Sequence, residues 1–392
     1  MRPYIKSIIA SFLVILACLG LGRFAFGMVI PNMQETLNIT TTQIGFIGTA
    51  NFIGYIVGIF FANFLYSKYT THKLIFITII LQGLSMLAMI FFIDYLLISF
   101  FYTLSGFFSA IVNMSIMAYM ANVIPKEVRG KALGTIVSGS GLAIIFSGQL
   151  VPIIENTITN MSWKTSWTIF ALMIIVIAFL SQPGIKKHAS HKMPDTKVNA
   201  NKYFKIPSFW KIGIIYMIFG ISYSIYVTYF VSAVIDKYNV STSLSGDFWT
   251  VVGFCSIFSG YIFGLIADKI GPYKTLVFVY CLQTIAHLIL AIDTNAYAIW
   301  FSAIIFGISV WSIPSLVALL TSLHFDVKRT AQVLSLVTLL FASCQAIGPV
   351  SAGYIYDITN DFSNVFLITS ILTFIAVIIS FIFSRQTIKQ IH

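Results

Sequence analysis

The stretch IIASFLVILACLGLGRFAFGMVI, residues 8–30, decides the fold class of this chain. Its one charged side chain is Arg23, and the other residues are apolar or small. A helix of roughly 20 apolar residues spans the hydrocarbon core of a bilayer, so this stretch is predicted to cross a membrane. Arg2 and Lys6 precede it as in a secretory signal, but it exceeds the roughly 7–15 apolar residues of a signal core, and no small-residue cleavage site follows. We therefore expect a retained first helix.

The remainder of the chain repeats this pattern. Its 392 residues are 58% hydrophobic and 9% charged, whereas soluble globular domains carry roughly 25% charged residues. A water-soluble enzyme is therefore excluded, and apolar runs bounded by charges, Pro, Asn or Asp predict twelve spans. The spans cover residues 8–30, 42–66, 74–93, 96–122, 132–155, 165–183, 210–235, 246–267, 275–292, 296–322, 331–355 and 363–384.

A polar, basic stretch separates the sixth span from the seventh. Residues 184–208 contain six lysines and almost no apolar pattern, which is typical of a linker. We predict an N-terminal six-helix bundle over 1–183, a cytoplasmic linker over 184–208 and a C-terminal six-helix bundle over 209–392. The predicted fold class is an all-α polytopic membrane protein with twelve transmembrane helices in two pseudo-symmetric bundles.

The basic residues indicate the orientation of the spans. Of the 23 Lys and Arg, only Lys164 and Lys237 fall on the opposite side from the rest, and Arg23 lies inside the first span. Cytoplasmic loops of multi-pass proteins carry the excess of cations, so we place both termini in the cytoplasm and the chain in the plasma membrane, the inner membrane of a bacterium. The net charge of +11 is thus a topology signal and does not predict nucleic-acid binding.

The sequence gives no support for a cofactor, a metal or catalysis. Cys18, Cys255, Cys281 and Cys344 lie in apolar runs without CxxC spacing, which argues against disulfides and zinc. A membrane-embedded enzyme needs a nucleophile with a base, or paired aspartates, at membrane depth, and no Asp or Glu falls in the middle of a span. We expect no catalytic residue, no cofactor and no metal site.

Short motifs recur in the two halves. GYIVG at 54–58 returns as GYIFG at 260–264, a shift of 206, and VRG at 128–130 corresponds to KRT at 328–330, a shift of 200. Internal duplication is typical of secondary transporters.

The segment GLIADKIGPYK, residues 264–274, resembles the loop motif of the major facilitator superfamily. The motif positions are Gly264, Asp268, Lys269, Gly271 and Lys274. The resemblance implies the superfamily fold and a gating role, in which a charge cluster latches the cytoplasmic helix ends. After the second span, Ala62 and Asn63 stand where the acid of a second copy is expected.

Further strings are similar to one branch of that superfamily, the YbfB/YjiJ type. They are GRF at 22–24, followed by Pro31, NFIGY at 51–55, and Trp249 ahead of Gly253. Two signatures of proton-linked antiporters are missing. Tyr102 stands where those proteins carry Arg, and no Pro follows Gly141. This makes a drug/proton antiporter a weaker hypothesis.

The resemblance implies that the first, fourth, seventh and tenth helices line a central cavity. Arg23 lies about 10 Å before the outer end of the first span, where a charge costs several kcal/mol unless it meets water, a counter-ion or a ligand. One interpretation is a clamp for a carboxylate or phosphate of the substrate. The other is a structural arginine that extends outward to water or pairs with Glu155.

Polar and aromatic residues on other spans are further candidates for substrate binding. Tyr223 and Tyr226 lie three apart on one face of the seventh span, where they form either a cavity wall or an interfacial belt. Trp311, next to Ser312 and Pro314, is placed opposite on the tenth span. The weaker candidates, which join helices more often than they bind ligands, are Asn51, Asn113, Tyr119 and Gln345.

The sequence therefore predicts a secondary transporter that moves a small organic solute, with an anion favoured by Arg23, by alternating access. Because no central carboxylate is present, facilitated diffusion or exchange of anions fits as well as proton symport. The expected partners are the substrate, the lipid bilayer and a coupling proton or counter-anion, and the expected state is a monomer. The alternatives are a membrane sensor with a transporter fold and a membrane-embedded enzyme without solute flux.

Overall fold

The computed structural model describes residues 4–158, 161–185, 203–292 and 295–388. Within these residues, twelve helical segments are long and apolar enough to cross a membrane. All twelve predicted spans are confirmed, and their ends differ from the prediction by at most seven residues. Most helices extend into their polar flanks, whereas the third span ends at Met89, before the predicted residue 93. Residues 186–202 of the predicted linker lie outside the described part of the chain.

The first six spans are formed by nine helical elements. They are α1 (Ile5–Ile15), η2 (Leu16–Phe24) and α2 (Phe26–Leu37), which together make one span, then α3 (Thr41–Lys68), α4 (Thr71–Met89), α5 (Tyr95–Val123), α6 (Lys126–Thr157), and α7 (Ser162–Ser181) with the short η3 (Gln182–Gly184).

The last six spans follow after the linker region. They are α9 (Pro207–Tyr238), α10 (Thr242–Ile270), α11 (Pro272–Ala291), α12 (Ala296–Val310) with α13 (Ser312–His324), α14 (Val327–Thr359) and α15 (Phe362–Ile388). The tenth span is broken at Trp311, whose backbone N–H donates to Ser259 Oγ of α10 at 3.0 Å. Pro314 follows the break and does not allow a regular helix through it.

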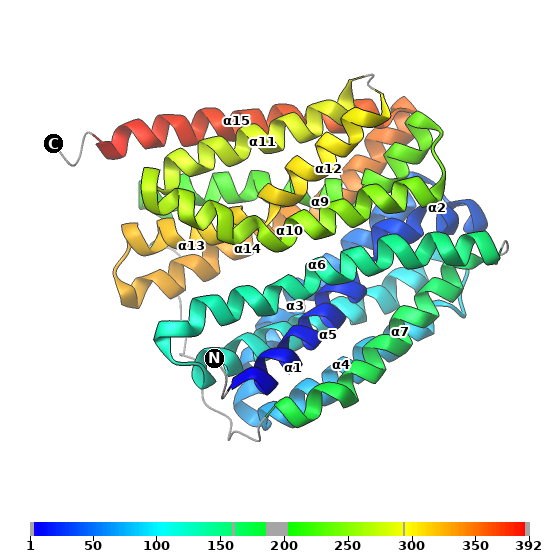
Figure 1. Ribbon diagram of the computed structural model, residues 1–392, viewed down its shortest axis with the longest axis horizontal. Coiled ribbons are helices and arrows are strands. Elements are labelled where there is room, and N and C mark those ends of the chain that lie inside the picture. The colour runs from blue at the N-terminus through cyan, green and yellow to red at the C-terminus, as the bar shows by residue number, and fades with distance from the viewer. Residues whose placement is uncertain (1–3, 159–160, 186–202, 293–294, 389–392) are drawn as a thin grey trace.

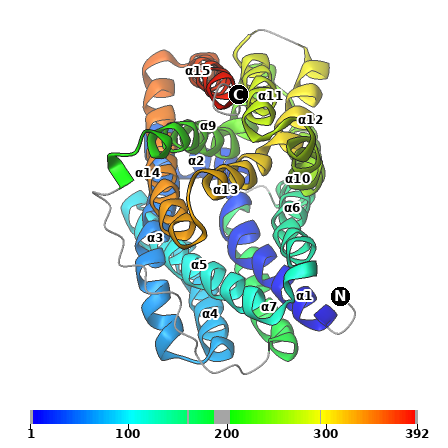
Figure 2. The same ribbon diagram turned by 90° about the vertical axis from the view of Figure 1, so that its left-hand side faces the viewer.

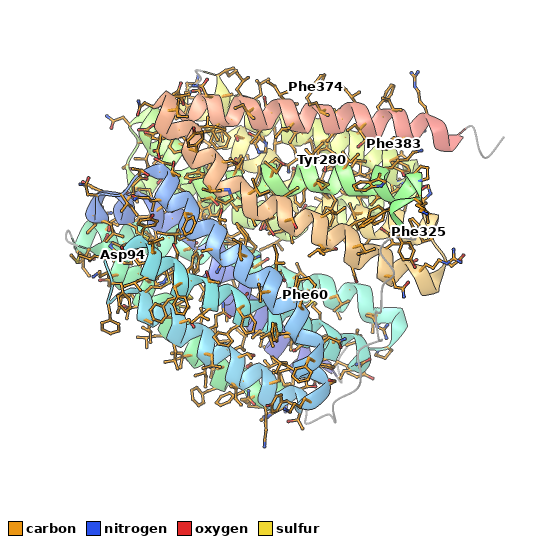
Figure 3. All side chains as sticks on the ribbon, turned by 180° about the vertical axis from the view of Figure 1, so that it is seen from behind. Phe60, Asp94, Tyr280, Phe325, Phe374 and Phe383 are labelled. Carbon is orange, nitrogen blue, oxygen red and sulfur yellow. The ribbon has the colours of Figure 1, made fainter. Side chains whose placement is uncertain are left out.

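The helices before and after the linker region form two groups. Figure 1 shows α1 and α3 to α7 in the lower part of the molecule and α9 to α15 in the upper part, with both termini toward its left-hand side, the side that faces the viewer in Figure 2. Asp94 lies at the opposite end from Phe325 and Phe383, and apolar side chains such as Phe60 and Phe374 project outward between the ends (Figure 3). The bundle boundaries at 183 and 209 stay a prediction.

Two helix crossings fix the register of the internal repeat. A Cβ on Gly106 of α5 would lie 2.0 Å from the Asn51 carbonyl oxygen of α3. In the second half, a Cβ on Gly307 of α12 would lie 2.7 Å from the Val252 carbonyl oxygen of α10. Gly106 and Gly307 are 201 residues apart, and so are Asn51 and Val252. The same shift relates the first residues of α3 and α10.

The shift of 206 predicted from the glycine strings is therefore wrong. Gly54 packs tightly on α5, where a Cβ would lie 1.9 Å from the Thr103 carbonyl oxygen, whereas Gly260 has no atom closer than 3.7 Å to such a Cβ. The two strings occupy different positions on their helices. At the structural shift, Asp268 corresponds to Ser67 and not to the neighbourhood of Ala62.

The two groups of helices meet tightly at the end opposite the termini. There α6 and α10 cross at Gly148 and Gly246, and a Cβ on either glycine would lie within 2.6 Å of the other's carbonyl oxygen. Further along the same helices, Gly141 and Gly253 are in similar contact, at 3.0 Å and 2.8 Å from carbonyl oxygen to Cβ. No larger side chain fits at the first crossing without moving a helix.

A carboxylate closes the same end between α14 and α3. The two oxygens of Asp357 accept hydrogen bonds from the backbone N–H groups of Thr41 and Thr42, at 3.0 Å and 2.8 Å. These N–H groups belong to the first turn of α3, where the helix dipole favours an anion. The Tyr229 hydroxyl lies 3.0 Å from both the Thr41 and the Pro349 carbonyl oxygens.

The closure is pseudo-symmetric. Glu155, in the last turn of α6, lies against Thr242, in the first turn of α10. Asp357 follows Glu155 by 202 residues and Thr242 follows Thr41 by 201, so each half contributes one acid and one helix start. We call these contacts, together with the Gly148–Gly246 crossing, the outer closure.

The same helices separate toward the end that carries the termini. A Cβ on Gly134 of α6 or on Gly264 of α10 would have no atom within 4 Å. A cavity of about 990 Å³ opens there, with Lys131 and Asp268 near its mouth and Trp311 at its inner end. The molecule is therefore open on the side of the termini and closed on the other, which is one of the two states of an alternating-access carrier.

Candidate functional site

The first span changes its winding just before the middle. Residues 16–24 form a π-helix, in which the Ala25 N–H bonds the Gly20 carbonyl oxygen at 3.1 Å, five residues back. π-Helical turns are rare and occur mostly at functional sites. The wider turn ends at Arg23 and Phe24, and so sets the direction in which both side chains leave the helix.

Neighbouring helices stabilise this turn. The Cys18 carbonyl oxygen accepts hydrogen bonds from Gln82 Nε2 of α4 at 2.9 Å and from Ser109 Oγ of α5 at 2.7 Å. Gly22 allows the approach of α4, because a Cβ there would lie 2.1 Å from Gln82 Nε2. The π-helix is thus fixed by polar contacts that a regular α-helix would not need.

Arg23 is buried between helices, with 8% of its surface exposed. Its Nε donates to Asn51 Oδ1 of α3 at 3.1 Å. The guanidinium carbon lies 4.8 Å from the centre of the Phe52 ring and 4.2 Å from that of Tyr55, within the range of cation–π attraction. The side chain therefore points across to α3 and does not extend outward to water.

The charge of Arg23 has no acidic partner. Among the described residues, no carboxylate lies within 4.0 Å of the guanidinium, and the predicted alternative of a pair with Glu155 is not formed. Nη2 is buried without a hydrogen-bond partner. Because buried charges are normally paired, this atom is the strongest indication of a ligand in the molecule.

Two asparagines position the surrounding groups. Asn51, which accepts from Arg23, donates through Nδ2 to the Tyr102 carbonyl oxygen at 3.2 Å. Asn113 of α5 donates through Nδ2 to the Tyr55 hydroxyl at 2.6 Å, and its Oδ1 is buried without a partner. Asn51 thus orients the guanidinium, whereas Asn113 leaves one acceptor free.

The second half contributes aromatic rings that pack against Phe24, the residue after Arg23. Phe24 lies 5.4 Å from Trp311 and 6.4 Å from Tyr223, measured between ring centres, and Tyr223 lies 5.6 Å from Trp311. Trp311 Nε1 is buried without a partner. We call the rings of the second half, Tyr216, Phe219, Tyr223, Trp311 and Phe341, the aromatic wall.

The aromatic wall and the arginine are near enough to interact. Tyr55, against which Arg23 stacks, is within electrostatic range of both Tyr216 and Tyr223, and Arg23 itself is within range of Tyr223. Gln345 of α14 lies against the Tyr223 hydroxyl. The candidate site therefore combines residues of both halves and lies where their relative movement would change it.

Six of the eight predicted binding residues come together here. They are Arg23, Asn51, Asn113, Tyr223, Trp311 and Gln345. Tyr226 faces another way, with its hydroxyl 2.8 Å from Ser302 Oγ and its ring stacked on Phe306 at 3.6 Å between centres. Tyr119 lies near the end of the molecule that carries the termini, with its hydroxyl 3.3 Å from Ser7 Oγ. Substrate binding by Tyr226 and Tyr119 stays a prediction. The contacts that their side chains make, away from Arg23, do not favour it.

Sequence reasoning missed Tyr55 and Phe341. Each lies four residues from a predicted site residue, Asn51 and Gln345, and therefore on the same helix face. That spacing is the signal that would have found them.

The predicted loop motif lies at the mouth of the cavity. Gly271 ends α10 with φ of 86°, a conformation that favours glycine, and Pro272 begins α11. Gly264 and Asp268 line the cavity, with Lys131 of α6 among the facing residues. Lys269 and Lys274 are exposed, and none of these charges forms an ion pair among the described residues. The gating role stays a prediction.

Comparison with known families identifies the chain. The family described as "Uncharacterised MFS-type transporter YbfB" matches residues 15–381. The chain belongs to this family of the major facilitator superfamily. It is thus a multi-pass membrane protein of a transporter family, and the resemblance found in the sequence is confirmed.

Its named relatives include carriers of carboxylates. The hexuronate transporter of Bacillus subtilis (strain 168) is 24% identical over 407 positions, which cover 94% of this chain and 92% of that one. The oxalate:formate antiporter of Oxalobacter formigenes is 26% identical over 291 positions, 70% of this chain and 66% of that one.

Solved structures of two other transporters have the same fold. A bacterial homolog of the human lysosomal transporter Spinster, described as inward-facing and unoccupied, aligns with a TM-score of 0.79 at 11% identity over 99% of this chain and 98% of that one. The nucleoside transporter NupG aligns with a TM-score of 0.77 at 12% identity over 97% and 98%.

Proposed function

We propose that this transporter binds an organic carboxylate at Arg23 and carries it unchanged across the plasma membrane. The observation that carries the proposal is the buried guanidinium, whose Nη2 has no partner and within 4.0 Å of which no carboxylate of the described residues lies. A guanidinium with forked donors is suited to a carboxylate. The substrates named for the two relatives, hexuronate, oxalate and formate, are all carboxylates, which supports the same class.

The orientation follows from the distribution of charge. Both termini lie in the cytoplasm of a bacterial cell, because nearly all loop lysines and arginines are on that side. The cavity then opens to the cytoplasm, and the outer closure faces the exterior. The transporter acts as a monomer, since one chain provides both halves of the site.

Exchange of one anion for another, or facilitated diffusion, fits the site better than proton symport. The residues around Arg23 are amides and aromatic rings, with no carboxylate to carry a proton. His287, the histidine buried in the ninth span, lies with its ring nitrogens 2.7 Å and 3.3 Å from the backbone oxygens of Gln283 and Ser222. Those contacts join helices and do not involve Arg23.

Counterflow in proteoliposomes tests the proposal. Vesicles loaded with an unlabelled carboxylate should accumulate the same labelled carboxylate transiently, because a carrier exchanges substrate across the membrane. Arg23→Gln should abolish this flux, whereas Arg385→Gln, which removes another arginine that stacks on a ring, should retain it. A folded protein without any counterflow would be a sensor or an enzyme, and equal flux of an amine in both variants would make Arg23 structural.

A further inference from the structure

We infer that the transported anion has a single carboxylate attached to a flat, mostly apolar ring. The inference rests on the proposed binding of a carboxylate at Arg23. It adds the number of charges on the substrate and the shape of its uncharged part. It follows from three features of the residues around the guanidinium.

The first feature is the number of charges. The residues that contact Arg23 are uncharged, and so are the residues of the aromatic wall. Arg23 is therefore the one charged side chain of this group. Among the described residues that line the cavity, the charged ones are Lys131, near the start of α6, and Asp268, near the end of α10. Neither residue contacts Arg23. A second carboxylate on the substrate would be buried against rings without a cation, which is strongly unfavourable.

The second feature is the shape of the aromatic wall. The Tyr216 and Phe341 rings are stacked at 4.3 Å with 15° between their planes, and Phe219 lies 5.7 Å from Phe341 at 19°. Tyr223 continues the series at 5.2 Å and 29° from Phe219. Four nearly parallel rings form a buried stack, and Trp311, which lines the cavity, adds a ring surface inclined at 60° to Tyr223. Such surfaces favour a flat ring, which gains both burial and ring–ring contact.

The third feature is the small supply of hydrogen-bonding groups. The hydroxyls of Ser222 and Ser224, on the same helix as the tyrosines, donate to the carbonyl oxygens of their own helix, each at 3.0 Å. Among the polar side-chain atoms of Arg23, its contacts Asn51 and Tyr55, Asn113, Gln345 and the aromatic wall, the buried ones without a partner are two donors, Arg23 Nη2 and Trp311 Nε1, and one acceptor, Asn113 Oδ1.

A carboxylate accepts from Arg23 Nη2, which leaves Trp311 Nε1 as one donor and Asn113 Oδ1 as one acceptor for the rest of the substrate. A sugar acid with several hydroxyls would leave most of them unpaired on burial, which opposes binding. The inferred substrate therefore differs from the hexuronate named for one of the relatives.

Four probe anions separate these features in a competition assay. Benzoate has one charge and a flat ring, acetate has the charge without the ring, terephthalate has the ring with two charges, and glucuronate has one charge on a hydroxyl-rich ring. We expect the dissociation constant of benzoate for the purified full chain to be at least about tenfold lower than those of the other three.

A variant of the aromatic wall provides the second part of the binding test. Phe341→Leu should weaken benzoate at least about fivefold and leave acetate within twofold, because only the ring contacts the wall. Phe374→Leu, a change of an exposed ring on the lipid-facing surface, is the control and should alter neither.

The outcomes distinguish a failure of the inference about the substrate body from a failure of the proposed carboxylate site. If glucuronate or terephthalate binds as tightly as benzoate, and this binding is lost in Arg23→Gln, the inference about the substrate body is overturned and the carboxylate site remains. If carboxylates bind equally well with and without Arg23, the proposed function itself fails. A protein that is folded by circular dichroism and binds none of the four probes also overturns the inference.

Discussion

At the scale of single residues, Arg23 is held at one nitrogen and free at another. Nε is fixed by Asn51, and the Phe52 and Tyr55 rings hold the guanidinium plane. Such an arginine is already arranged for a ligand and loses little freedom on binding. In the proposed complex, the free Nη2 would bind the substrate carboxylate without rearrangement of the side chain.

Lysine should not replace this arginine. Arg23→Lys keeps the positive charge but loses the planar fork, so it cannot bond Asn51 and the substrate at the same time. We expect a dissociation constant for the best carboxylate that is about tenfold higher, measured by competition binding. A lysine variant with wild-type affinity would mean that only the net charge matters.

An internal carboxylate should inhibit the transporter. Asn51→Asp places an acid about 3.1 Å from Arg23 Nε, where it forms an ion pair that Arg23 does not make with any described residue of the native protein. We expect carboxylate binding to weaken at least about tenfold, while the melting temperature is not lowered, because the buried charge is now paired. Asn156→Asp, at the exposed end of α6, is the control. Unchanged binding in Asn51→Asp would show that Arg23 does not contact the substrate.

At the scale of helices, α6 contains one glycine that packs tightly against α10, Gly148, and one that packs against no other helix, Gly134. Gly148→Ala would place a Cβ 2.6 Å from the Gly246 carbonyl oxygen, whereas Gly134→Ala meets no atom within 4 Å. Overpacking of this kind costs typically about 1–3 kcal/mol. We expect Gly148→Ala to favour the state in which the outer closure is open, and Gly134→Ala to have no effect on this equilibrium.

Solvent accessibility of an outer cysteine measures this shift. With the native cysteines replaced, Ser243→Cys, next to the α6–α10 crossing, should react with a membrane-impermeant maleimide faster in Gly148→Ala than in Gly134→Ala. Equal rates would contradict a role for the glycine crossing in the closure.

The elements were predictable to different degrees. Each span is a long apolar run with polar ends, so hydropathy alone predicts it. The π-helix of the first span was not predictable, because it depends on hydrogen bonds from Gln82 and Ser109, which belong to other helices. The different orientations of Tyr223 and Tyr226 were not predictable for a related reason. Residues three apart are about 60° apart around a helix, which is enough for Tyr223 to face Arg23 and Tyr226 to face Phe306.

At the scale of the whole molecule, the outer closure depends on helix starts of one half and acids of the other. Asp357→Asn keeps the size of the side chain but removes the charge that interacts with the first turn of α3. We expect a loss of about 1 kcal/mol, roughly a fivefold shift toward the outward-open state.

Distances between spin labels test the shift. Labels at Leu96 and Tyr297, both exposed at the ends of α5 and α12, report the separation of the halves on the outer side. The longer distance should be more populated in Asp357→Asn than in the wild type, and an identical distribution would argue against this carboxylate as part of the closure.

The whole account depends on contact between Arg23 and a substrate carboxylate. The most direct measurement is a double-mutant cycle with the best-bound carboxylate and its primary amide, using dissociation constants for the wild type and for Arg23→Gln. We predict that the wild type prefers the acid and that the variant loses this preference, with a coupling of about 1.5–3 kcal/mol. A coupling near zero, with acid and amide weakened equally, would contradict the account.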